Sequence, residues 1–106
     1  MSLFEENAVI LRNMEAGGND LGQSRSVDFS HIFPGRAQAV AFAREAEQQG
    51  FSATVETVDR EDNPWDVTAS KDMVPTCDNI TQIEKRLHAL AQAHYGRADG
   101  WGFFRV

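Results

Sequence analysis

The stretch SVDFSHIFPGRAQAVAFAREAEQQG, residues 26–50, decides the fold. Its first eight residues alternate in character, and successive side chains of a strand point to opposite faces of a sheet. One set consists of Val27, Phe29, His31 and Phe33, and the set between them of Asp28, Ser30 and Ile32. Pro34 and Gly35 then interrupt the pattern. The stretch therefore opens with a predicted half-buried strand over residues 26–33.

A helix is predicted directly after this break, over Arg36–Gln49. The segment is rich in Ala and Glu and contains no helix-breaking residue. One face of this helix, called its small face below, carries mainly small side chains, and it consists of Ala39, Phe42, Ala43 and Ala46. Such a face suits close packing on a sheet. Gly50 is predicted to cap the C-terminal end of the helix.

A hairpin is predicted to follow. Residues Phe51–Asp59 are β-branched and alternating, and residues Trp65–Met73 alternate again. The sequence REDNP between them, residues 60–64, has the residue types of a turn. The two predicted strands therefore pair with each other.

A second helix is predicted after Val74-Pro75 ends the hairpin. Asp78 or Asn79 serves as its N-cap, and an apolar stripe extends to about His94. Thr81 and Glu84 also have the spacing of a capping box.

The chain is predicted to close with a short strand over Trp101–Arg105, after Gly96 ends the second helix. The resulting order is βαββαβ, and each βαβ unit crosses over with a right hand. This order predicts an α+β ferredoxin-like fold. Its sheet has four antiparallel strands, with both helices on one face and the last strand beside the first. All 106 residues are predicted to form a single domain.

An additional helix precedes the predicted ferredoxin-like core, residues 26–106. Its apolar positions are Phe4, Ala8, Leu11 and Met14. Their spacing predicts an amphipathic helix within an N-terminal helical extension, residues 1–20. The sequence leaves open whether this helix covers the open face of the sheet or one of its edges.

The charge balance disfavours direct binding of nucleic acid. The chain has 10 basic and 16 acidic residues, a formal net charge of −6. Binding to phosphates requires a cationic surface, whereas an acidic protein suits a basic protein partner. A single cysteine and the absence of an apolar run of about 18 residues favour a cytoplasmic protein without a membrane span. The oligomeric state is left open.

Few residues are candidates for catalysis or metal binding. His88 and His94 lie six residues apart on a helix, which is a poor spacing for a shared metal ion. Cys77 precedes a helix, where we expect a small structural residue, and His31 fits a partly buried strand position. The sequence therefore predicts no catalytic residue, no metal and no cofactor. The alternative is a small-molecule-binding or minor enzymatic domain with a site near His31.

Acidic residues gather at the predicted hairpin tip. Asp59, Glu61, Asp62 and Asp66 lie beside Trp65, and Arg60 is the basic residue among them. They form either a solvated turn or a negative patch with an aromatic anchor for a basic partner. The second interpretation makes Asp59, Glu61, Asp62, Trp65 and Asp66 the candidate partner-binding residues.

The second half of the chain resembles a known family. The pattern W-x-V-x-x-S-x-D-M-V-P-T over residues 65–76, together with D-G-W-G over residues 99–102, is similar to the regulator of ribonuclease E activity B (RraB) family. The resemblance extends from about Val27 to Gly102. The motif residues that we interpret as structural are Asp72, Met73, Pro75, Asp99, Gly100, Trp101 and Gly102. Trp101 is expected to seal the core end of the last strand, and a partner contact is the alternative.

The resemblance implies a fold and a function. The implied fold is ferredoxin-like, in agreement with the prediction from the residues. The implied function is that of a non-enzymatic regulator, which binds the scaffold region of ribonuclease E and restrains RNA cleavage without touching RNA. An interaction module for an unrelated protein is the remaining alternative.

Overall fold

The structure is a computed structural model that describes residues 2–16 and 24–102. Three helices and four strands lie within these residues. In chain order they are α1 (Leu3–Ala16), β1 (Arg25–Phe33), α2 (Arg36–Gln48), β2 (Ser52–Thr57), β3 (Trp65–Met73), α3 (Cys77–Ala93) and β4 (Arg97–Gly102). No helix within the described ranges has the length and apolar character needed to span a membrane.

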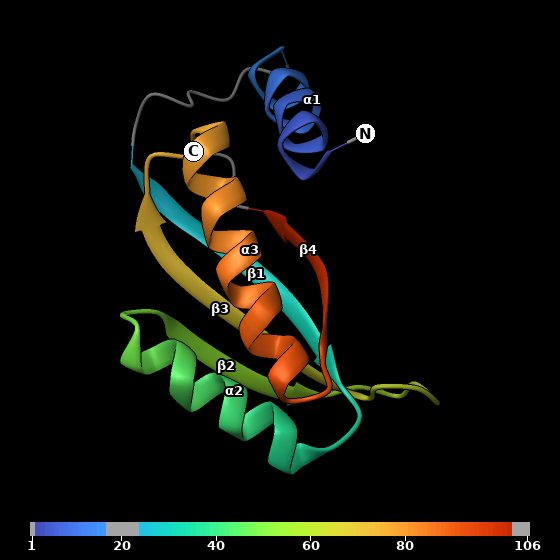
Figure 1. The fold of residues 1–106 in the computed structure, drawn as a ribbon. Coiled ribbons are helices and arrows are strands. Elements are labelled where there is room, and N and C mark those ends of the chain that lie inside the picture. Colours follow the sequence, from blue (N-terminus) through green and yellow to red (C-terminus); the bar gives the residue numbers. More distant parts are fainter. Residues whose placement is uncertain (1, 17–23, 103–106) are drawn as a thin grey trace.

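The strands form one antiparallel sheet in the order β2-β3-β1-β4. The last strand therefore lies beside the first, and α2 and α3 pack on the same face (Figure 1). These features confirm the predicted ferredoxin-like α+β fold. The helix-free face is called the open face below.

The core lies between the sheet and the two helices. β1 supplies Val27, Phe29 and Phe33, which are fully or almost fully buried. Phe42 of α2 packs against the ring of Phe33, with the ring centroids 5.0 Å apart. The small face of α2 is buried as predicted, which lets this helix lie close to the sheet.

Helix α1 packs against α3, close to the end of β4 (Figure 1). Its buried residues are Asn7 and Leu11. Of the two positions that the sequence left open, the structure therefore places α1 near an edge strand and not over the open face.

The N-terminal end of α3 differs from the prediction. The N-cap is Thr76, whose side chain accepts a hydrogen bond from the backbone N–H of Asn79 at 3.1 Å. The predicted caps, Asp78 and Asn79, lie inside the first turn. Thr76 competes successfully because its extended backbone lets the hydroxyl reach the exposed amide groups of that turn.

Both core helices end in the same hydrogen-bond pattern, the Schellman motif. At the end of α2, Gly50 has φ +94°, as suits the predicted cap glycine. At the end of α3, Tyr95 has φ +63° and the next residue is Gly96. A β-carbon at Gly96 would lie 2.2 Å from the ring of Phe33, so a glycine is needed there for close packing and not for its φ angle.

The closing strand begins four residues earlier than predicted, at Arg97, and it contains a β-bulge. Ala98 pairs with His31, whereas Gly100 pairs with Ser30, so Asp99 is an extra residue. The extra residue shifts the alternation and places Trp101 opposite Phe29, on the core side. The rest of the predicted strand, residues 103–105, lies outside the described residues.

The bulge makes Gly100 and Gly102 a matched pair for a test of backbone strain. Gly100 has φ +117°, and no atom lies within 4 Å of a β-carbon built on either glycine. Gly100→Ala is therefore expected to lower the free energy of unfolding by about 1–3 kcal/mol through strain alone. Gly102→Ala is expected to change it by less than about 0.5 kcal/mol. Urea denaturation of the two variants measures the difference, and equal losses would contradict the role of the bulge.

Candidate functional site

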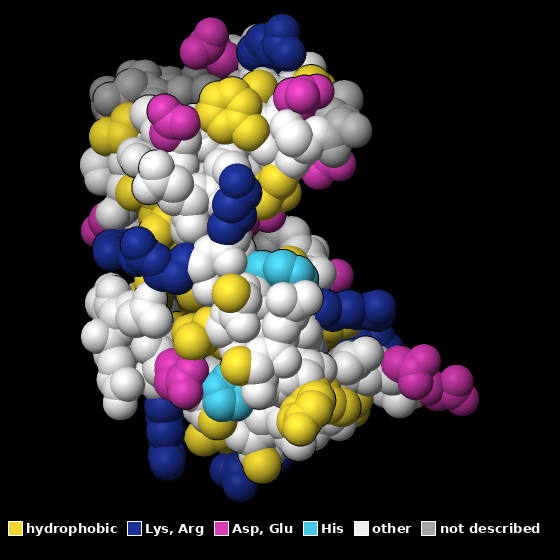
Figure 2. Space-filling view, in the orientation of Figure 1, with side chains coloured by type: hydrophobic (Ala, Val, Ile, Leu, Met, Phe, Trp, Pro, Cys, Tyr) yellow, Lys and Arg dark blue, Asp and Glu magenta, His cyan; other side chains and the backbone are white. Residues whose placement is uncertain are grey.

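The predicted acidic patch lies on the loop between β2 and β3. The predicted strand before it ends two residues early, at Thr57, so the loop covers Val58–Pro64. It projects from the body of the protein, and Figure 2 shows acidic side chains at its end. Asp59, Glu61 and Asp62 are all exposed there.

Arg60 organises this loop from within. Its Nε donates to the backbone carbonyls of Asp62 and Asn63, at 2.9 and 3.0 Å. Its Nη2 lies 2.8 Å from Oδ1 of Asp66. One arginine therefore fixes the turn and neutralises one carboxylate, while the three carboxylates of the tip stay exposed to solvent.

The structure does not bring Trp65 together with these carboxylates. Trp65 is half-buried and packs against the core, on the helix side of the sheet. Asp66 follows it in β3, so its side chain lies on the open face. The loop thus presents charge, and the aromatic ring of Trp65 contributes mainly to the core.

A buried polar cluster, which the sequence analysis did not identify, joins α1, α3 and β4. Asn7 exposes only 2% of its surface. Its Nδ2 donates to Oγ1 of Thr81 at 3.0 Å and to Oε1 of Glu84 at 2.8 Å. Its Oδ1 accepts a hydrogen bond from Nε1 of Trp101 at 3.0 Å. Asn7, Thr81, Glu84 and Trp101 are called the Asn7 cluster below.

The cluster gives two sequence motifs a different meaning. Thr81 and Glu84 do not cap a helix, because they lie well inside α3, where both contact Asn7. Trp101 of the D-G-W-G motif is tied to α1. A signal for Asn7 was present in the sequence, since Phe4, Asn7, Leu11 and Met14 share one helical face. A single amide on an apolar stripe indicates a buried hydrogen-bond partner.

Burial raises the pKa of Glu84 above its ordinary value, and this effect outweighs the hydrogen bond from Asn7, which lowers the pKa. The charge of Glu6 raises it further. The carboxyl of Glu84 is therefore held in a site that disfavours its charged form.

The histidines and the cysteine lie apart from one another. His31 is buried against the ring of Phe42, with the centroids 4.9 Å apart, and burial lowers its pKa to about 4. Nε2 of His94 lies 3.1 Å from Oε2 of Glu45. The thiol of Cys77 donates to the carbonyl of Phe4 at 3.1 Å. Among residues 2–16 and 24–102, no group of three or more His, Cys, Asp or Glu side chains is placed to hold a metal ion.

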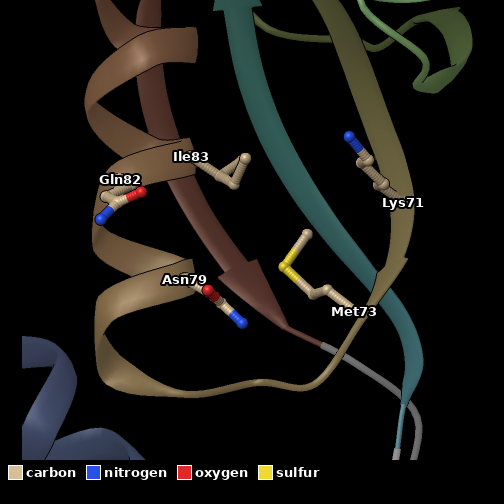
Figure 3. A pocket seen from close by; sticks show the side chains of 5 residues that line it. All are labelled: Lys71, Met73, Asn79, Gln82 and Ile83. Carbon is tan, nitrogen blue, oxygen red and sulfur yellow. The ribbon is translucent and has the colours of Figure 1, made fainter.

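The D-M-V-P-T motif lies where β3 passes into α3. Met73 points into a pocket of about 200 Å³, where it faces Ile83, and Lys71 lies on the strand side of the same pocket (Figure 3). Pro75 is fully buried. Asp72 points the other way and is exposed on the open face. The motif therefore combines buried residues with one exposed carboxylate.

The fold and the Asn7 cluster define the class of protein to which this chain belongs. It is a small α+β protein with a ferredoxin-like sheet, an N-terminal helix docked on α3 and a projecting acidic loop. A family model described as Regulator of ribonuclease activity B, RraB, matches residues 4–103, and the chain belongs to this family. The match includes α1 as well as the core. Comparison with curated proteins gave no match.

The raised pKa of Glu84 predicts a pH-dependent stability difference. Because the folded protein holds this proton more tightly than the unfolded chain, ionisation of Glu84 lowers stability as the pH rises above about 4.5. Glu84→Gln keeps the oxygen that accepts from Asn7 but does not ionise. We expect the variant to gain stability relative to the wild type as the pH is raised from 4 to 7, as measured by urea denaturation.

The control for this prediction is Glu61→Gln, which removes a carboxylate from the exposed loop. The stability difference between this variant and the wild type is expected to stay nearly constant over the same pH range. A Glu84→Gln variant that behaves like the control would show that Glu84 ionises as freely as a surface residue.

Proposed function

We propose that this protein binds a ribonuclease of the ribonuclease E type and restrains its cleavage of RNA by protein–protein contact, without catalysing a reaction itself. The observation that carries the proposal is membership of a family of regulators of ribonuclease activity, over residues 4–103. Regulation of a ribonuclease implies a protein partner. The resemblance of the motifs points to the scaffold region of the nuclease as the part that is bound.

The charge of the protein supports contact with the nuclease rather than with its RNA substrate. The chain carries a net charge of −6, and the projecting loop adds three exposed carboxylates at one place. Such a surface repels phosphates and attracts basic protein segments, which speeds encounter. We place the interaction in the cytoplasm, where a protein with one free cysteine stays reduced.

The environments of the reactive side chains support a non-enzymatic role. His31 is enclosed by the core and packs against the ring of Phe42. A phenyl ring can neither give a proton to the imidazole nor take one from it. The thiol of Cys77 donates a hydrogen bond to the backbone carbonyl of Phe4. Asp59, Glu61, Asp62 and Asp66 remain the candidate residues for the partner, with Trp65 supporting the strand beside them.

The role of the loop is tested by removing its charge in a cleavage assay with a purified ribonuclease of the ribonuclease E type. The loop variant carries Asp59→Asn, Glu61→Gln and Asp62→Asn. Each exposed ion pair contributes about 0.2–1 kcal/mol, so the concentration needed for half-inhibition is expected to rise about tenfold. Raised ionic strength is expected to weaken inhibition by the wild type as well.

The matched control carries Glu5→Gln, Glu15→Gln and Glu47→Gln, which remove the same charge from exposed helix positions. It is expected to inhibit nearly as well as the wild type. Equal losses in the two variants would show that only net charge matters, and a wild-type protein that leaves cleavage unchanged at low ionic strength would refute the proposed function.

A further inference from the structure

The open face of the sheet is left without a covering element in the described part of the chain. Helices α2 and α3 pack on the opposite face, and α1 packs on α3 (Figure 1). Alternation along β1 places Asp28, Ser30 and Ile32 on the open face. Ile32 exposes only 5% of its surface, so it offers little apolar area to a partner.

Hydroxyl and acidic side chains dominate this face. Six positions on β1, β2 and β3 that point there are Ser or Thr. The charged side chains that alternation and register place there are Asp28, Glu56, Asp66, Asp72 and Arg97. Recognition by this face therefore depends on hydrogen bonds and negative charge.

Glu56 is an exposed carboxylate of this face. It lies in β2, directly opposite Asp66 of β3. Arg60 is already paired with Asp66, so the charge of Asp66 is compensated within the protein. The carboxylate of Glu56 is therefore available to a cation from a partner.

The shape of the face suits an extended chain. Gly100 and Gly102 of β4 leave open space above the backbone, since no atom lies within 4 Å of a β-carbon built on either one. At the other side of the sheet, a hollow of about 380 Å³ is lined by Ser26, Gly50, Ser52, Ser70, Asp72 and one basic residue, Lys71. A backbone can therefore approach closely at β4, and long side chains have room at the β2 side.

We propose that the open face binds an extended segment rich in arginine and lysine, which belongs to the ribonuclease partner and crosses the sheet toward the acidic loop. The inference rests on the proposed function. Three other occupants fit the face less well. A second copy would bring carboxylates against carboxylates, RNA would bring phosphates against them, and an apolar helix would find little apolar surface.

The first test measures binding of a short fluorescently labelled peptide of alternating Arg and Ser to the full chain, by fluorescence anisotropy. The face variant carries Asp28→Asn, Glu56→Gln and Asp72→Asn. The amide that replaces the Asp28 carboxylate keeps an oxygen that can accept the hydrogen bond from Ser70. A loss of affinity of roughly two- to fivefold per carboxylate is expected. The matched control of the preceding section, with Glu5→Gln, Glu15→Gln and Glu47→Gln, removes the same charge elsewhere and is expected to bind like the wild type. Equal affinity of the face variant and this control would overturn the proposal.

The second test uses Glu56→Gln alone and compares affinity with stability. The affinity for the peptide is expected to fall about two- to fivefold. The urea midpoint of the free protein is expected to stay nearly unchanged, because Glu56 is exposed and Asp66 is already paired with Arg60. A residue with a merely structural role would change the urea midpoint and leave the affinity unchanged. Glu61→Gln, in the loop, serves as the control for stability. A variant that keeps its affinity for the peptide would contradict the proposed place of binding.

The nuclease assay separates this inference from the proposed function. A face variant that inhibits the nuclease as well as the wild type would refute the open-face site and leave the proposed function intact. A wild-type protein that fails to inhibit the nuclease but binds the peptide through this face would refute the proposed function and leave the surface intact. Failure of the wild-type protein to bind the peptide would overturn the inference.

Discussion

The hydrogen bond from the indole of Trp101 to the side chain of Asn7 is the contact on which the arrangement of the helices and the last strand depends. Asn7 is buried, so each of its polar atoms needs a partner, and an unsatisfied one would cost about 1–3 kcal/mol. The same amide group bonds Thr81 and Glu84 of α3. One side chain thus holds together three elements that are distant in the sequence. Because hydrogen bonds are directional, this cluster fixes the position of α1 more precisely than apolar contact alone would.

This contact in turn requires the β-bulge. Ala98 already faces the core side, opposite His31, so strict alternation would place Trp101 on the open face. The extra residue at Asp99 and the positive φ of Gly100 reverse the alternation. The D-G-W-G motif can therefore be understood as one device, in which Asp99-Gly100 forms the bulge and Trp101 uses the face that the bulge provides.

The sequence predicted the elements whose patterns are local, and it missed those set by distant contacts. Alternation in the strands and the apolar faces of the two core helices predicted the elements, and their βαββαβ order predicted the sheet and the strand order. The bulge was missed because it is defined by pairing with β1, about 70 residues away. The partner-binding residues remain proposals, since exposure of Asp59 or Glu61 shows availability and not binding. Trp65 shows the limit of a linear pattern, because residues adjacent in a strand lie on opposite faces.

The two faces of the sheet therefore serve different ends, and the difference explains why acidic residues can be concentrated on one of them. On the helix side, substitution of Phe29 or Val67 would disturb a close-packed core. On the open face, the side chains at the intervening positions do not pack into this core, so they can be polar or charged without disturbing it. Asp28, Glu56 and Asp72 occupy such positions, and their carboxylates give the open face its negative charge. Asp66 differs from them, because its charge is paired with Arg60 within the protein.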